Sequence, residues 1–173
     1  MGLIYSHIVF ALKNSRYDWQ KIKRKKPAGF IAPTYSFLIG KEEELLIEEL
    51  CKTADEIDLN IHSFSFCGDH VHAIILHDSM AISKLMLLWK GKSAYSFNKR
   101  MLTGDKKVDD GSAGSKQEGL WAKSFYHKTI KSNEEYRNVK HYIENNRKKH
   151  GLSPLSEISA ELIRYLLSKN KND

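Results

Sequence analysis

Hydrophobic and polar positions follow two different periods along the chain, and each stretch of constant period predicts one element. Short runs of β-branched and aromatic residues predict strands over residues 3–12, 59–67, 70–77 and 120–130. Apolar residues spaced three and four apart predict helices over residues 41–58, from Asp78–Ser79 to Arg100, over residues 133–149, and from Ser153–Pro154 onward. Only the turn signal Gly68–Asp69 separates the two middle strands, so we expect them to form a hairpin.

The order of these elements predicts an α+β fold. The first six run strand, helix, strand, strand, helix, strand, which is the order of the split βαβ arrangement in ferredoxin-like antiparallel sheets. We therefore expect helices on one face of the sheet and further helices at the C-terminal end. Residues 1–151 are predicted to form one domain, with residues 103–119 as a mobile surface loop because Gly, Asp, Lys and Ser dominate there. Residues 152–173 are predicted to form a C-terminal helix and tail.

The excess of basic residues indicates an acidic partner. A net charge of +7 at pH 7 favours nucleic acid first and an anionic membrane surface second. Clustered lysines bind backbone phosphates without reading sequence, and basic residues beside aromatic ones suit single-stranded nucleic acid. The alternative is a solvated loop and a solvated helix face. The candidate contacts to nucleic acid are Lys21, Lys23, Arg24, Lys25, Lys26, Lys90, Lys92, Arg100, Arg147 and Lys148.

Cysteine usage and hydropathy indicate the compartment. Cys51 and Cys67 form no short-spaced pair and stand among apolar residues, so we expect both to be reduced core residues. No apolar run reaches the about 18 residues of a membrane span, and the N-terminus has no signal-peptide pattern. These features predict a cytoplasmic protein that does not bind a membrane.

The candidate chemistry begins with two histidines at the start of the second hairpin strand. Alternate residues of a strand point to the same face, so His70 and His72 project together. Their Cα atoms would lie roughly 6.6–7 Å apart, which lets two imidazoles converge on one cation. The alternative is a pair of half-exposed strand residues without a ligand. We expect His7, in the middle of the first strand, to be a packed or hydrogen-bonded residue.

A second candidate group lies on the helix over residues 133–149. Tyr142 and Asn146 are four residues apart, so they share a face and can reach the same small volume. Tyr142 offers a hydroxyl, and Asn146 offers an amide oxygen that could complete a metal site. The alternative for Tyr142 is a packing role. The spacing does not exclude Tyr126 or Tyr136 from any role that needs a tyrosine.

Several segments resemble one enzyme group over residues 3 to about 150. Gly68-Asp69-His70-Val71-His72 resembles the His-hydrophobic-His motif of HUH single-strand endonucleases. Within that group the chain is similar to the single-tyrosine transposases, which are the REP-associated tyrosine transposases and the enzymes of the smallest bacterial insertion sequences. The residues that carry this likeness are Ser83–Gly91, Leu120–Tyr126, Glu134–Tyr136 and Tyr142–Asn146.

The resemblance implies a ferredoxin-like fold and a divalent metal, Mg²⁺ or Mn²⁺. It further implies that His70, His72 and Asn146 bind the metal and that Tyr142 is the nucleophile. The insertion-sequence branch usually has Gln where Asn146 stands and resembles obligate dimers. The REP-associated branch typically has Asn followed by Pro and need not dimerise. Arg147 follows Asn146 here, so the branch and the choice between monomer and homodimer stay open.

The resulting hypothesis is a transposase that cleaves and rejoins single-stranded or hairpin DNA. Tyr142 would attack phosphorus with metal assistance and leave a 5′-phosphotyrosine and a free 3′-OH. Because the phosphodiester bond is exchanged and not hydrolysed, a second strand end can rejoin without ATP. One alternative is a non-catalytic, domesticated relative that only binds hairpin DNA or RNA. Another is a metal-dependent phosphodiesterase that uses water, with a structural role for Tyr142.

Overall fold

A computed structural model of the chain describes residues 2–13, 15, 37–103 and 119–169. The strands are β1 (Leu3–Ala11), β2 (Asn60–Phe66), β3 (His70–Asp78) and β4 (Tyr126–Thr129), and the helices are α2 (Lys41–Glu56), α3 (Ile82–Thr103), α4 (Asn133–Lys149) and α5 (Glu157–Ser168). The basic candidates Lys21, Lys23, Arg24, Lys25 and Lys26 lie outside the described residues, as do positions 104–118 of the predicted loop and the final four residues of the predicted tail.

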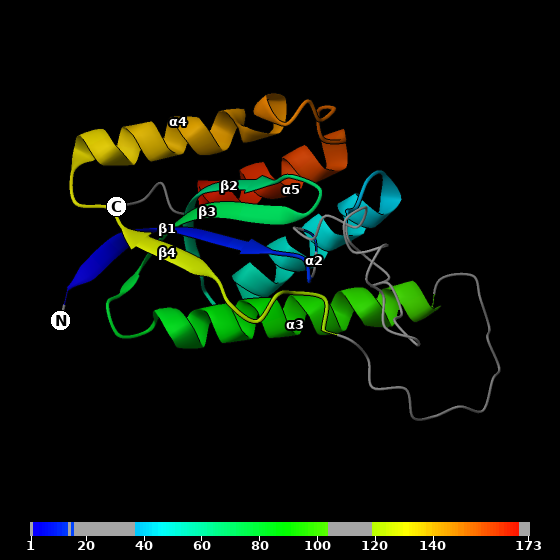
Figure 1. Cartoon of the computed structure of the whole chain (residues 1–173). Helices are drawn as coiled ribbons and strands as arrows, with labels where there is room; N and C mark the ends of the chain where they lie inside the picture. The colour runs from blue at the N-terminus through cyan, green and yellow to red at the C-terminus, as the bar shows by residue number, and fades with distance from the viewer. Residues whose placement is uncertain (1, 14, 16–36, 104–118, 170–173) are drawn as a thin grey trace, which may run out of the picture.

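The strands form one antiparallel sheet in the order β2-β3-β1-β4 (Figure 1). This is the strand order of a split βαβ sheet, so the predicted fold class is confirmed. Strand β3 lies between β2 and β1, and its register with β1 pairs His72 with Val9. That register places the odd-numbered residues of β1 and the even-numbered residues of β3 on the same face of the sheet.

One face of the sheet carries the hydrophobic core. Ile8, Phe10, Val71 and Ala73 point from β1 and β3 to this face and are almost fully buried. Helices α2 and α3 supply the other half of the core, to which Leu46, Leu50, Trp89 and Phe97 belong. The indole N–H of Trp89 donates to the carbonyl oxygen of Leu50 at 2.9 Å, which satisfies its one buried donor and ties the two helices together.

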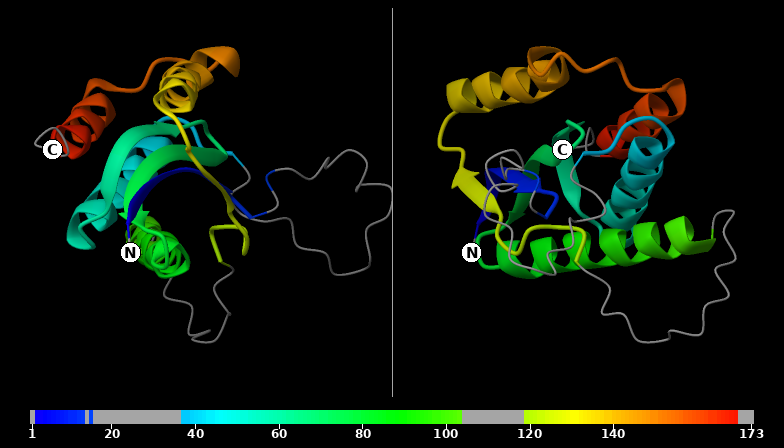
Figure 2. Two further views of the ribbon diagram at one scale, coloured as in Figure 1. Left: turned by 90° about the vertical axis from the view of Figure 1, so that its left-hand side faces the viewer. Right: turned by 45° about the vertical axis from the view of Figure 1, so that its right-hand side comes forward.

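Helix α4 covers the opposite face of the sheet (Figure 2). It begins at the N-cap Ser132, whose hydroxyl accepts from the backbone N–H of Glu135 at 3.1 Å, as the sequence predicts. Ile143 and Asn146 are the buried residues of this helix, whereas most of its other residues are at least partly exposed. The space between α4 and the sheet therefore holds both apolar and polar side chains.

Three predicted boundaries were wrong, and for the two helices the cause is local. Helix α3 starts at Ile82 because residues 78–81 form a turn in which the N–H of Ala81 donates to the carbonyl oxygen of Asp78 at 2.9 Å. Helix α5 starts at Glu157, since Ser156 and not Ser153 is its cap. Strand β4 covers four residues of the predicted range 120–130, and in the segment before it Trp121 forms an isolated bridge with Leu12.

None of the described helices is both long enough and apolar enough to cross a membrane.

Candidate active site

His70 and His72 lie on the sheet face that α4 covers. Their side chains point to the same side of β3, with ring centroids 4.9 Å apart and ring planes at 77°. Both residues are buried, with exposed fractions of 8% and 6%. The rings therefore converge, as the alternation along the strand predicts, and do not splay to opposite faces.

A carboxylate holds His70 through its δ nitrogen. Asp69 directly precedes His70, and its Oδ1 makes a short hydrogen bond with Nδ1 of the imidazole. The turn that places Asp69 requires glycine at position 68, where φ is +74° and an added Cβ would collide with the ring of Phe37. His150, just beyond α4, also contacts His70, with ring centroids 5.2 Å apart.

Asn146 reaches His70 from α4. Its side chain is fully buried, and its Nδ2 lies 3.5 Å from Nε2 of His70 and donates to Sγ of Cys67 at 3.2 Å. The amide oxygen Oδ1 is buried and accepts no hydrogen bond from the described residues. Buried polar atoms are nearly always paired, so this oxygen marks a place where a ligand or an ion is expected. Burial raises the pKa of the Cys67 thiol, which favours its neutral form.

His72 has a histidine partner from β1. Nε2 of His7 lies 3.0 Å from Nδ1 of His72, and the two rings are stacked, with centroids 5.3 Å apart. The expectation that His7 is hydrogen-bonded is therefore confirmed, although its partner had no signal in the sequence. Burial lowers the pKa of His7, and the Lys128 ammonium lowers it further, so the neutral imidazole is favoured at neutral pH.

Tyr142 stands over this pair of histidines. Its ring centroid is 5.4 Å from that of His72 and 6.3 Å from that of His7, and 38% of the residue is exposed. The ammonium of Lys149, two turns further along α4, lies 5.0 Å from the centre of the tyrosine ring. The phenol is thus open to solvent on one side and close to the imidazoles on the other.

The two other candidate tyrosines occupy different places. Tyr126 is 53% exposed on β4, with its ring centroid 6.1 Å from that of His7. Tyr136 is in the first half of α4 and packs against Tyr5, at a centroid distance of 5.1 Å. Burial raises the pKa of Tyr136, which keeps its phenol protonated. Of the three tyrosines, Tyr142 is the one with a described ring contact to His72.

Arg147 holds the C-terminal part of α4 in place. Its guanidinium forms an ion pair with the carboxylate of Glu43 on α2 and donates to the carbonyl oxygens of Phe66 and Ser153 at 2.8 and 2.6 Å. Both charged side chains are largely buried, at 14% and 12% exposure. These partners give Arg147 a structural task that the sequence analysis missed, and its contact with DNA stays a prediction.

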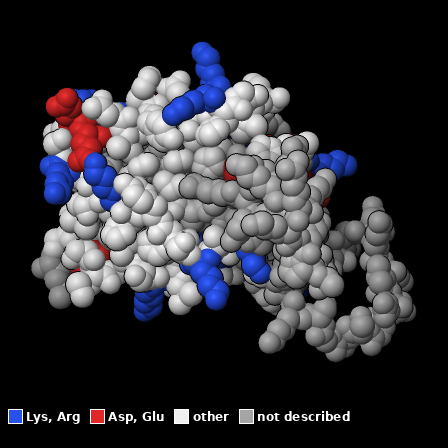
Figure 3. Space-filling model, viewed as in Figure 1, with Lys and Arg blue, Asp and Glu red and all other residues white. Residues whose placement is uncertain are grey.

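The basic residues of α3 lie on the other side of the sheet from the histidines. Lys92 pairs with Glu56, and Arg100 pairs with Glu48 and Glu49. Lys148 is exposed on α4. Lys and Arg side chains are spread over the face that Figure 3 presents, and acidic side chains gather near the N-terminal end of α4. Contact between these cations and nucleic acid stays a prediction.

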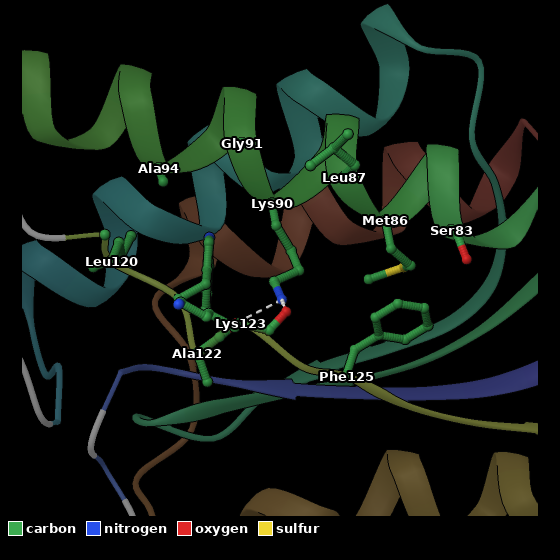
Figure 4. Close-up of a pocket in the computed structure, with 12 residues that line it drawn as sticks. Ser83, Met86, Leu87, Lys90, Gly91, Ala94, Leu120, Ala122, Lys123 and Phe125 are labelled. Carbon is green, nitrogen blue, oxygen red and sulfur yellow. Dashed lines mark hydrogen bonds between the residues drawn. The ribbon is translucent and has the colours of Figure 1, made fainter.

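Lys90 has three backbone partners. Its Nζ donates to the carbonyl oxygens of Ala122, Lys123 and Ser124 at 2.7, 3.1 and 3.2 Å, beside an apolar pocket of about 420 Å³ between α3 and the segment before β4 (Figure 4). Burial lowers the pKa of this ammonium. The pocket is on the core side of the sheet, so it is separate from the histidine site.

The donor set between α4 and the sheet fits a divalent cation. Two imidazoles and the unpaired carboxamide oxygen of Asn146 offer the nitrogen and oxygen atoms that such ions bind. Across the described ranges there is no group of three or more His, Cys, Asp or Glu side chains that could hold a metal. A site here therefore depends on Asn146 as its third protein ligand.

Comparisons with known proteins point to one family. The profile of a family described as "Transposase IS200 like" matches residues 2–146. A search of curated proteins finds no match. Among solved structures, the chain is similar to a REP-associated tyrosine transposase bound to a REP hairpin, with a TM-score of 0.53, 14% identity, and coverage of 87% of this chain and 70% of that one. A candidate transposase from Deinococcus radiodurans R1 is similar at a TM-score of 0.48 and 19% identity, with 84% and 92% covered.

Proposed function

Since the chain belongs to the IS200-like transposase family, we propose that this transposase cleaves and rejoins single-stranded DNA through Tyr142. The observation that carries the proposal is the position of that phenol. It is partly exposed, and its ring centroid lies 5.4 Å from that of His72 in the same chain. A nucleophile for DNA must be open to a large substrate and close to groups that stabilise charge on phosphate, and Tyr142 meets both conditions.

His70, His72 and Asn146 would hold a divalent cation, Mg²⁺ or Mn²⁺. When bound, such an ion supplies charge stabilisation at a phosphate oxygen and orientation of the scissile group. The buried amide oxygen of Asn146, which accepts no hydrogen bond from the described residues, supports this assignment. Imidazole nitrogen favours Mn²⁺ over Mg²⁺ in affinity, whereas Mg²⁺ suits oxygen ligands.

The reaction is an exchange of two phosphodiester bonds. The Oη of Tyr142 attacks phosphorus and loses its proton to solvent, the bond from phosphorus to the 3′ oxygen breaks, and that oxygen takes up a proton to become a free 3′-OH. The product is a 5′-phosphotyrosine on Tyr142. A second 3′-OH then attacks the same phosphorus, which restores the phenol and joins the two strands. The Lys149 ammonium, 5.0 Å from the ring, is placed to offset negative charge near the phenol.

DNA is the proposed partner, and hairpin DNA in particular. The similar REP-associated tyrosine transposase was solved bound to a REP hairpin. The net charge of +7 supports binding to an acidic polymer. A single-stranded segment beside a hairpin would reach Tyr142 from the side on which the tyrosine is open to solvent.

The direct test incubates the purified protein and Mn²⁺ with labelled single-stranded DNA that carries a hairpin. We expect a covalent protein–DNA adduct that resists denaturation and disappears in Tyr142→Phe. Tyr126→Phe is the matched control, because Tyr126 is also exposed and near His7, and it should retain the adduct. An undiminished adduct in Tyr142→Phe would refute the assignment.

The same assay separates the alternatives. Cleavage to hydrolysis products without any trapped adduct would indicate a phosphodiesterase that uses water. DNA or RNA binding that is unchanged by EDTA and by His70→Ala, with no cleavage, would indicate a non-catalytic hairpin-binding relative. Either result would replace the proposed function.

A further inference from the structure

Each histidine of the pair on β3 has a hydrogen-bond partner at its δ nitrogen. For His70 the partner is the carboxylate of Asp69, one residue earlier in the hairpin turn. For His72 the partner is the imidazole of His7 on the neighbouring strand, with 3.0 Å between the two ring nitrogens. The two partners come from different elements and have different chemistry, yet both engage the same ring atom.

The Asp69 contact determines which nitrogen of His70 carries hydrogen. An ionised carboxylate only accepts hydrogen bonds, so Nδ1 of His70 must be the donor. A neutral imidazole has one N–H, so Nε2 of His70 is then the nitrogen with the lone pair. That Nε2 is the atom that lies 3.5 Å from the side chain of Asn146.

The His7 contact couples the tautomer of His72 to that of His7. Of the two facing nitrogens, one must carry hydrogen and the other must accept it. If Nε2 of His7 accepts, His72 is the Nδ1–H tautomer and its Nε2 has the lone pair. If Nε2 of His7 donates, His72 carries hydrogen on Nε2 and cannot bind a cation through that atom.

We propose that Asp69 and His7 are positioning residues that hold His70 and His72 in the Nδ1–H tautomer, so that both imidazoles present Nε2 as the basic nitrogen. A ligand histidine generally donates its other N–H to a fixed acceptor, which sets both the tautomer and the ring orientation. The inference deepens the proposed function and rests on it only for the ligand role of the two histidines. The tautomers themselves belong to the metal-free chain.

The first experiment reads the tautomers without metal or DNA. Long-range ¹H–¹⁵N correlation spectra of the labelled, metal-free chain distinguish a protonated ring nitrogen from one with a lone pair. We expect Nδ1 protonated and Nε2 unprotonated in His70 and His72, with signals assigned by their loss in His70→Ala and His72→Ala. An Nε2–H tautomer at His72 or at His70 would overturn the proposal for that residue.

Two pairs of variants test the cause. His7→Leu and Asp69→Ala remove the acceptors, whereas His7→Gln and Asp69→Asn keep a carbonyl oxygen that can accept. We expect the first variant of each pair to change the tautomer balance of its own histidine only, and the second to restore it. His77 is the internal control, since its Nδ1 and Nε2 bond to the Asp78 carbonyl and to Ser6 on the opposite sheet face. Unchanged tautomers in folded His7→Leu would contradict the proposed role of His7.

Mn²⁺ affinity gives a second readout. Loss of an outer partner of a metal ligand typically weakens metal binding by about 10- to 100-fold. We expect a weakening of this size in His7→Leu and Asp69→Ala, measured by electron paramagnetic resonance of free Mn²⁺, and recovery in the amide variants. If the tautomers are as proposed but Tyr142→Phe still forms the DNA adduct, the proposed function fails and the positioning role stands. If the tautomers differ from those proposed while the adduct depends on Tyr142, the positioning role fails and the proposed function stands.

Discussion

At the scale of single residues, Asn146 combines complete burial with a polar atom that has no partner among the described residues. It is fully buried, its amide nitrogen bonds to Cys67, and its oxygen accepts nothing from the described residues. An unpaired buried polar atom costs about 1–3 kcal/mol of stability. A position of this kind is typical of a functional site, where stability is given up for binding.

Asn146→Leu tests this residue because leucine has similar volume and no oxygen. We expect Mn²⁺ affinity to fall by at least the about 10- to 100-fold that loss of an outer partner causes, and the DNA adduct to disappear. Asn145→Leu is the control, since the Asn145 amide is exposed and bonds within α4 to the carbonyl oxygen of His141. Equal Mn²⁺ affinity in the two variants would exclude Asn146 as a ligand.

Lys90 is a residue for which sequence and structure suggest different tasks. The sequence indicates contact with nucleic acid, whereas the ammonium donates to three backbone carbonyl groups that precede β4. Lys90→Met keeps the aliphatic stem and leaves these acceptors without their donor. We expect the free energy of unfolding to fall by about 1–3 kcal/mol in urea titrations.

The DNA affinity of Lys90→Met separates the two tasks. Each phosphate contact to a single strand contributes about 0.7 to the slope of log affinity against log salt concentration. We expect that slope to be the same in the variant and the parent chain. A decrease of about 0.7 would mean that Lys90 contacts a phosphate after all.

At the scale of elements, the attachment of α4 decides whether the site exists. Ile143 is the apolar residue that this helix buries fully, and Tyr136 packs against Tyr5. The C-terminal half of the helix is held by Asn146 and by Arg147, which binds Glu43 and two carbonyl groups. Since Tyr142 and Asn146 are on this helix, a small shift of α4 moves the proposed nucleophile and the proposed third ligand together. The sheet, by contrast, is supported by the main core.

Arg147→Lys tests that attachment while it keeps the positive charge. Lysine has no planar fork, so it cannot satisfy the carboxylate and both carbonyl groups at once. We expect unfolding to become easier by about 1–3 kcal/mol and adduct formation to slow, with unchanged DNA affinity. Arg147→Ala should be more destabilising, by about 3–5 kcal/mol, because it leaves the carboxylate of Glu43 buried and unpaired. A lysine variant with parental stability and adduct rate would contradict this structural role.

At the scale of the whole molecule, one chain contains every group that the proposed site needs. The ring contact between Tyr142 and His72 and the contact between Asn146 and His70 are both within the same chain. A monomer would then be sufficient for cleavage. The alternative is an exchange of α4 between two chains, which would give shared sites.

A mixing experiment tests this expectation. His72→Ala and Tyr142→Phe each lack one required group, and sites within one chain cannot be repaired by a partner. We therefore expect no adduct when equal amounts of the two variants are combined, measured against the parent chain at the same total concentration. Adduct formation in the mixture, but in neither variant alone, would demonstrate that sites are shared between chains.

The sequence by itself determined the elements, their order and the side on which the key residues project. The parity of a strand places His70 and His72 on one face, and the helical period aligns Tyr142 with Asn146. These are properties of a few consecutive residues. For that reason the pattern predicted the fold class, and it predicted that the members of each pair share a face. The starts of α3 and α5 depended instead on local turn and cap geometry.

Only the tertiary structure decided which distant residues meet. The register between β1 and β3 brings His7 to His72, and the docking of α4 brings Asn146 to His70 and Arg147 to Glu43. It also directs the ammonium of Lys90 toward backbone carbonyl groups. Such contacts follow from how the sheet and helices pack, and no period along the chain encodes them.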